Sequence, residues 1–138
     1  MTVLRRDPAR IAAHTAADLA ALKSAAVATI NDRCGAERAK YITTSKGQES
    51  VYALKKEEAR AWLADPAPVL ALYPHMQAEV GLTAPTPAEL AQIWMNVSAY
   101  WAGASARIEG ARMRAFAMIA VAGDAAGIDA VVAAFRPE

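Results

Sequence analysis

The sequence contains few of the residues that form cross-links, bind metals or carry out catalysis. Its 138 residues include one cysteine, Cys34, and two histidines, His14 and His75. A single cysteine excludes an internal disulfide and fits a reducing compartment or a structural thiol. Neither histidine has a cysteine, a carboxylate or the other histidine at ligand spacing, so we expect no metal site. Phosphate-binding, nucleophile and metalloprotease motifs are also missing. The sequence therefore predicts no cofactor, no catalytic residue and no enzyme activity.

The sequence also lacks an excess of positive or of negative charge. The chain has 15 basic and 14 acidic residues, which gives a formal net charge of +1. Binding to nucleic acid requires a concentrated basic surface. The one local cluster, formed by Arg5, Arg6 and Arg10, is too small to supply it. We therefore expect no nucleic-acid partner.

Long apolar runs of the kind that cross or target a membrane are not found. The polar residues His14, Thr15 and Asp18 interrupt any apolar segment near the start, so we expect no signal peptide. The apolar run over 115–122 is far shorter than the roughly 18 residues that a membrane-spanning helix needs. We therefore expect no membrane partner.

Helix is the secondary structure that the composition favours. Alanine, the strongest helix former, makes up about a quarter of the chain. The 7 glycines and 7 prolines fall mostly at a few breaks. A chain of this length usually forms one domain. We expect an extended arm over residues 1–6 and a single helical bundle domain over 7–138.

Two long helices are expected, over about 8–42 and about 87–122. Asp7-Pro8 is a typical helix start, and Thr86-Pro87-Ala88-Glu89 combines a capping box with proline in the first turn. A narrow apolar stripe follows the first helix at spacings of three or four, and includes Ile11, Thr15, Leu19, Leu22, Ala26, Ile30 and Cys34. In the second helix two sets of residues repeat every seven positions: Leu90, Val97, Ala104, Ala111 and Met118, and Trp94, Trp101, Ile108 and Ala115.

Shorter helices should complete the fold. The pattern predicts one over about 48–64, ended by Asp65-Pro66-Ala67-Pro68, and a short one from Pro74 to Gly81. A last helix should begin after Asp124. The predicted fold class is thus all-α, an elongated helical hairpin or bundle with two long helices and two or three shorter ones.

A long uncharged run is the most informative feature within this pattern. From Leu90 to Ala106 the sequence has no charged side chain. A helix without a charged stripe is buried on several sides, in its own bundle or against another subunit. We expect Trp94, Val97, Trp101 and Ile108 to form the intramolecular seam. The other flank is the predicted partner interface, made of Met95, Ala99, Tyr100, Gly103 and Ala106.

Short words spread over about residues 30–120 resemble a known class of proteins. They are Glu37-Arg38-Ala39-Lys40-Tyr41-Ile42-Thr43, Gly47-Gln48-Glu49, Tyr52, Lys55, Glu58-Ala59, Trp62-Leu63, Tyr73-Pro74, Ala78-Glu79-Val80-Gly81, Trp101, Ile108-Glu109 and Arg112. Together they resemble small helical proteins that tailed bacteriophages and prophages encode in their tail gene modules, often beside tail-fibre genes. The resemblance implies a structural or accessory role in the tail, near the fibre or baseplate, without catalysis.

The resemblance also implies the partners and location to be expected. The partner would be a phage tail or tail-fibre protein, with the chain acting as a homo-oligomer or assembly subunit in the virion tail or the host cytoplasm. One alternative is a cytoplasmic chaperone that helps a tail fibre to assemble and is not retained in the virion. A small regulatory protein that binds a host factor or DNA is the other, although the balanced charge argues against DNA.

Overall fold

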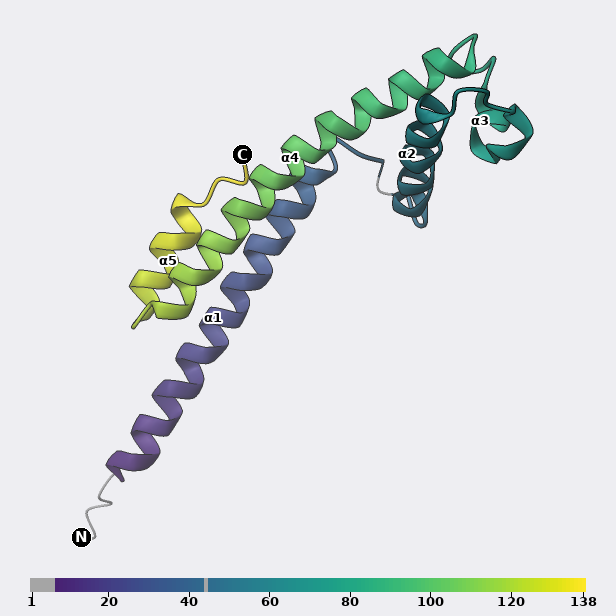
Figure 1. The fold of residues 1–138 in the computed structure, drawn as a ribbon. Coiled ribbons are helices and arrows are strands. Elements are labelled where there is room, and N and C mark those ends of the chain that lie inside the picture. The colour runs from purple at the N-terminus through teal and green to yellow at the C-terminus, as the bar shows by residue number, and fades with distance from the viewer. Residues whose placement is uncertain (1–6, 44) are drawn as a thin grey trace, which may run out of the picture. The chain divides into compact units, whose positions relative to one another are not determined.

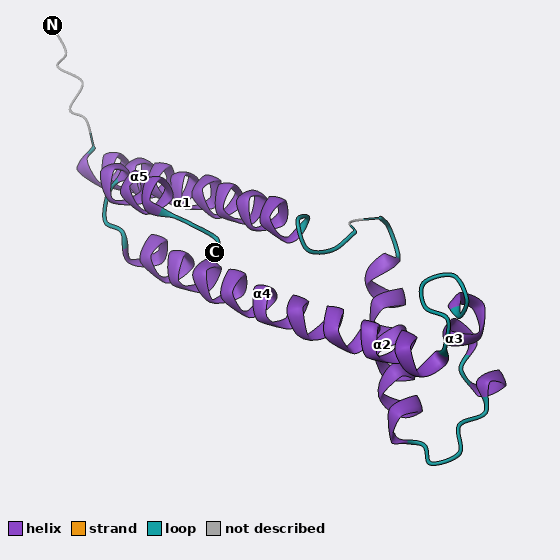
Figure 2. Cartoon of the chain, turned by 90° about the horizontal axis from the view of Figure 1, so that it is seen from above, coloured by secondary structure: helices purple, strands orange, loops and turns teal. Residues whose placement is uncertain are grey.

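The computed structural model describes residues 7–43 and 45–138, so the arm expected over residues 1–6 lies outside the described residues. The elements are α1 (Pro8–Arg38), α2 (Gln48–Ala64), the 3₁₀ turn η1 (Leu70–Leu72), α3 (Pro74–Glu79), α4 (Pro87–Val121) and α5 (Ala125–Ala134). Figure 2 shows helices joined by loops and turns, and the described residues contain no strand. The expectation of an all-α protein is thus confirmed. Among these residues, none of the helices combines the length and apolar character needed to cross a membrane.

Side-chain caps mark the starts of α1, α4 and α5, where the sequence predicts them. The Asp7 carboxylate accepts a hydrogen bond from the Ala9 backbone N–H (3.0 Å) at the start of α1. At the start of α4, the Thr86 hydroxyl accepts from the Glu89 N–H (3.3 Å) and donates to the Glu89 carboxylate (3.0 Å). Asp124 accepts from the Gly127 N–H (2.8 Å) and caps α5. These contacts satisfy backbone donors that have no partner within their own helix.

One helix end differs from the prediction. The first helix stops at Arg38 and does not continue to residue 42. Tyr41, which lies within the predicted bounds of the first helix, is in the turn that follows α1 and packs its ring against Tyr100 and Trp101 of α4. Contacts between aromatic rings stabilise this turn, in place of the hydrogen bonds that one further turn of helix would form.

The chain divides into two compact units. Unit 1 combines the described residues up to Arg38 with Ala106–Glu138, and unit 2 is Ala39–Ser105. The helix α4 is continuous and supplies residues to both. This division cannot be seen in the sequence, because neither of the two connections between the units, at residues 38–39 and within α4, contains a proline or a polar linker.

Unit 1 is made of α1, the C-terminal part of α4, and α5 (Figure 1). Each helix contributes residues that are less than a tenth exposed at three- or four-residue spacing. They are Ala26, Ile30 and Cys34 of α1, Ile108, Ala111, Ala115 and Ile119 of α4, and Ile128 and Val131 of α5, with Phe135 just after it. The packing of Cys34 as a small buried side chain matches its place on the predicted stripe.

Polar contacts secure the edges of unit 1. Glu109 of α4 forms ion pairs with Arg38 of α1 (3.0 Å) and with Arg112 one turn along α4 (2.7 Å). Lys23 donates to the carbonyl of Ala120 (2.6 Å), one of the last carbonyls of α4. Cationic side chains at a helix C-terminus interact favourably with its free carbonyls.

The buried stripe of α4 departs from the strict seven-residue repeat. Met118, the last residue of the first predicted set, is 55% exposed, whereas its neighbour Ile119 is 1% exposed. The physical reason is that a straight helix has 3.6 residues per turn, so a seven-residue repeat drifts around the helix by about 20° each time. After two repeats from Ala104 the residue that faces the core is 119 and not 118.

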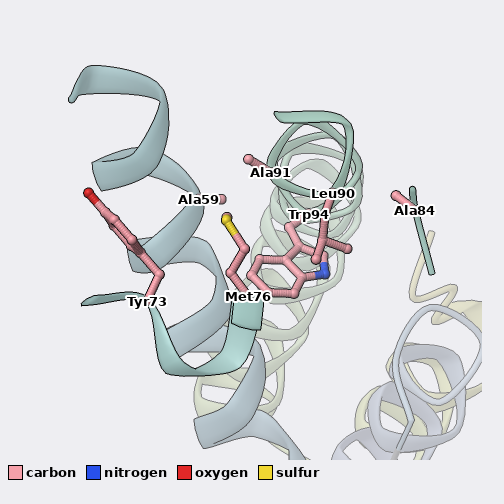
Figure 3. Close-up of a cluster of buried hydrophobic side chains, with 7 residues drawn as sticks. All are labelled: Ala59, Tyr73, Met76, Ala84, Leu90, Ala91 and Trp94. Carbon is pink, nitrogen blue, oxygen red and sulfur yellow. The ribbon is translucent and has the colours of Figure 1, made fainter. Parts of the chain in front are cut away.

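Unit 2 has a separate core built on α2, α3 and the N-terminal part of α4. Its buried residues are Ala59, Tyr73, Met76, Ala84, Leu90, Ala91 and Trp94. Figure 3 shows Met76 of α3 between Ala59 on α2 and Trp94 on α4. The short α3 therefore packs between the two longer helices. The turn that follows it contains Gly81 with a φ of +87°, in the left-handed region that glycine adopts without strain.

A carboxylate from α2 holds the start of α3. Glu58 accepts hydrogen bonds from the backbone N–H groups of His75 (3.1 Å) and Met76 (2.9 Å), and its Oε1 lies 2.6 Å from His75 Nδ1. Burial by itself would raise the pKa of Glu58, but the hydrogen bonds from His75 and Met76 outweigh it, and the pKa lies below its ordinary value of 4.5. The ionised form of Glu58 is thus the form that fits this site.

The change of register in α4 gives a direct test with two adjacent residues. We expect Ile119→Ala to lower the free energy of unfolding by about 2–5 kcal/mol, because it opens a cavity in a packed core. The matched control, Met118→Ala, should change it by less than about 0.5 kcal/mol, because the side chain is mostly in water. Urea unfolding followed by circular dichroism measures both, and equal losses would contradict the register.

The Glu58 contact predicts a pH dependence of stability. A carboxyl group whose pKa is lowered by folding stabilises the fold above its unfolded pKa, and this contribution is lost as the pH falls through the folded pKa. The variant Glu58→Gln should therefore be less stable than the wild type near pH 7, by about 1–3 kcal/mol for hydrogen bonds to a charged group. Unfolding curves from pH 7 down to pH 3 should show the two proteins converging. A constant difference over this range would contradict the assignment.

Candidate partner interface

Four of the five residues predicted to form a partner interface are exposed. Ala99, Tyr100 and Gly103 lie on α4 within unit 2, and Ala106 is the first α4 residue of unit 1. Tyr100 is the largest of them and is 67% exposed. Met95 differs, because it is half-buried and packs against the core of unit 2. The Met95 side chain therefore contributes mainly to the core of unit 2 and less to the exposed surface.

The seam expected on the other side of α4 is only partly found. Trp94 and Ile108 are buried, at 8% and 2% exposed, and Trp101 is half-buried. Val97 is 50% exposed, so its assignment to the intramolecular seam was wrong. Drift of the repeat does not explain this, because Leu90 and Ala104 of the same set are buried on either side; Val97 instead follows Trp94, the last α4 residue in the buried core of unit 2, and precedes Ala104, the next buried residue of α4.

Val97 instead belongs to an exposed apolar stripe. Ile93, Val97 and Tyr100 follow one another at spacings of four and three residues, which places them on one side of the helix. They are 38%, 50% and 67% exposed. We refer to these three residues together with Ala99 and Gly103 as the α4 face. Ile93 was not predicted as part of the interface. Spacing alone could not identify it, because residues that face a partner and residues that face a core recur at the same intervals along a helix.

The core behind the α4 face is held by a group of polar contacts around Trp94. Lys55 of α2 forms an ion pair with Glu79, the last residue of α3. The Lys55 ammonium also lies 5.2 Å from the centre of the Trp94 ring. Burial would raise the pKa of Glu79, but the hydrogen bonds from Lys55 and Thr83 lower it overall. The helices α2, α3 and α4 thus meet at this point.

Aromatic rings support the exposed end of the α4 face. The centre of the Tyr41 ring lies 5.6 Å from that of Tyr100 and 6.4 Å from that of Trp101, with the rings tilted against one another. Such contacts hold the rings in place and contribute roughly 0.5–1.5 kcal/mol beyond buried area. A preordered tyrosine loses little side-chain freedom when a partner covers it, which is the property of a binding hot spot.

The chemistry of the α4 face is that of an apolar contact surface. Its polar side chains include the amides of Gln92 and Asn96, which lie between Ala99 and Tyr100 around the helix and form a hydrogen bond with each other (2.9 Å). Among the described residues, no group of histidine, cysteine or acidic side chains is arranged to hold a metal ion. The arrangement is suited to bury a neutral surface.

Cys34, the one thiol of the chain, is fully buried in the core of unit 1. Burial raises the pKa of the thiol, and the positive charges of Arg38 and Arg112 only partly oppose this effect. A thiol with a raised pKa and no access to solvent is a poor nucleophile.

The two tryptophans of α4 should respond differently to truncation. Trp94→Ala should lower the free energy of unfolding by about 3–5 kcal/mol, because it removes a buried ring from the centre of unit 2. Trp101→Ala, which the seam prediction placed in the same class, should cost only about 1–2 kcal/mol for a half-buried ring. Urea unfolding of the two variants measures the difference, and a larger loss for Trp101→Ala would contradict the placement.

No family model matches this chain, and it matches no curated protein and no solved structure.

Proposed function

We propose that this protein is a non-enzymatic structural or accessory component of a bacteriophage tail, located near the tail fibre or the baseplate, that binds another tail protein through the α4 face. The observation that carries the proposal is the stripe of Ile93, Val97 and Tyr100, which is exposed along a helix that has no charge from Leu90 to Ala106. Exposed apolar stripes of this kind are typical of protein–protein contact sites. The tail as the location is supported by the resemblance of residues 30–120 to small tail-module proteins.

An assembly role is the second candidate. A cytoplasmic chaperone for a tail fibre would need the same kind of surface, since it must cover apolar parts of an incomplete partner. It would bind reversibly and would be absent from the finished particle. A small regulatory protein that binds a host factor is the third candidate, and the α4 face suits it equally well.

The first test is the composition of the particle. If the protein is a tail component, mass spectrometry of purified virions should find it in a fixed ratio to the major tail proteins. Recovery from infected cells in complex with a fibre protein, together with absence from virions, would support the chaperone. Absence from both would contradict the tail assignment. The genes on either side give an independent check, since tail genes are expected there.

Two substitutions one residue apart test the α4 face itself. Gly103→Glu should leave the monomer folded, with a modest gain in helix propensity, and should abolish binding to the partner, because it buries an unpaired charge in the contact. The control is Ala102→Glu, which adds the same charge at an exposed position about 100° further round the helix. Co-purification with particles or with the fibre protein measures binding, and circular dichroism checks the fold. Loss of binding in both variants, or in neither, would contradict the assignment of this face.

A further inference from the structure

Unit 1 contains a hollow between α1 and α4, which run alongside each other (Figure 2). Its volume is about 360 Å³, and its lining residues are Lys23, Ser24, Val27, Phe116, Ile119 and Ala120. Lys23 and Val27 lie one turn apart on α1, as do Phe116 and Ala120 on α4, so the hollow spans about one turn of each helix. Sites for small molecules in proteins measure roughly 300–1,000 Å³. The hollow therefore has room for a small ligand.

The apolar walls of the hollow are held in place by the rest of unit 1. Ile119 is 1% exposed and belongs to the core. The Arg112 guanidinium lies 4.7 Å from the centre of the Phe116 ring, and Arg112 is itself fixed by its ion pair with Glu109 (2.7 Å). A cation stacked on an aromatic ring restrains the ring. An apolar ligand thus meets a preformed surface, which lowers the cost of binding.

One positive charge lies at the edge of the hollow. Lys23 is half-buried, and its ammonium donates a hydrogen bond to the carbonyl of Ala120 (2.6 Å), which holds it beside the apolar walls. An ammonium group has three N–H donors, so two remain for other acceptors. Among the residues that the structure describes, no carboxylate forms an ion pair with Lys23. The charge that complements this hollow is therefore negative.

We propose that the hollow binds a small carboxylate with an apolar chain, of the kind represented by medium-chain fatty acids. The chain lies against Val27, Phe116 and Ile119, and the carboxylate accepts hydrogen bonds from the free N–H groups of Lys23. Hydrogen bonds between charged groups are the stronger ones, so the acid group determines the choice of ligand. This site is independent of the tail assignment, because it lies in unit 1 whereas the α4 face lies in unit 2.

Three ligands with the same chain and different head groups test the site in the full-length protein. In an NMR titration, octanoate should shift the backbone amide signals of residues 23–27 and 116–120. It should bind roughly tenfold or more tightly than octan-1-ol, because an ion-paired hydrogen bond is added to the same apolar contact. Octylammonium should bind more weakly than the alcohol, because its charge has the same sign as Lys23. Equal affinity for the acid and the alcohol would overturn the proposal, and so would shifts confined to residues 93–103, which would place the ligand on the α4 face.

The variant Lys23→Gln tests the charge. Glutamine keeps an N–H donor for the Ala120 carbonyl but has no positive charge. Octanoate should bind this variant roughly tenfold or more weakly than the wild type, and octan-1-ol should bind both equally well. Unchanged binding of octanoate would overturn the role of Lys23.

Two adjacent leucine substitutions test the hollow itself. Ser24→Leu adds apolar volume at the lining and should weaken the binding of both octanoate and octan-1-ol at least severalfold. The matched control is Ala25→Leu, which adds a leucine at an exposed position about 100° further round α1 and should weaken neither. Circular dichroism should show the wild-type helix content in both variants, since neither residue is buried. Equal effects of the two substitutions would contradict the location of the site. These outcomes do not depend on whether the protein is found in virions.

Discussion

One continuous helix contributes to both cores of this protein, and the rest of the structure depends on it. Leu90, Ala91 and Trp94 of α4 are buried in unit 2, while Ile108, Ala115 and Ile119 are buried in unit 1. A helix that serves two cores needs apolar side chains along most of its length. This need explains why many residues of the uncharged run from Leu90 to Ala106 are apolar. It does not explain the apolar residues Ile93, Val97 and Tyr100, because their side chains are exposed.

The two units achieve their packing by different means. Unit 1 relies on repeated small and medium-sized side chains at helical spacing, with the ion pairs of Glu109 at its edge. Unit 2 has only one short helix to place between two longer ones, so polar groups help to position it. Glu58 holds the start of α3 and Lys55 holds Glu79 at its end. Both carboxylates have lowered pKa values, because the hydrogen bonds they accept outweigh the effect of burial.

The high alanine content has a consequence for the surface of α4. Alanine favours helix but offers little apolar area, so each unit buries a thin stripe and leaves adjacent stripes exposed. The stripe of Ile93, Val97 and Tyr100 in the α4 face is one of them.

Sequence alone determined the features that depend on neighbouring residues. The starts of α1, α4 and α5 follow from Asp7, Thr86 and Asp124, because a cap needs only the next three residues to form its hydrogen bonds. The all-α class follows from the alanine content and the placement of the prolines for the same reason. The sequence also predicted that Ala99, Tyr100 and Gly103 lie outside the core, because they belong to the flank of the uncharged run that was assigned to a partner.

Only the tertiary structure decided which of several apolar stripes is buried. Met118 and Ile119 are equally apolar in the sequence, and the small drift of the helix over two repeats determines which one faces the core. The same holds for Val97, Met95 and Ile93, whose burial depends on where α2 and α3 pack. The end of α1 at Arg38 and the division into two units depend on contacts between residues far apart in the chain, such as Tyr41 with Tyr100. Local sequence patterns cannot predict such contacts, because they depend only on neighbouring residues and are the same whether or not the distant residues meet.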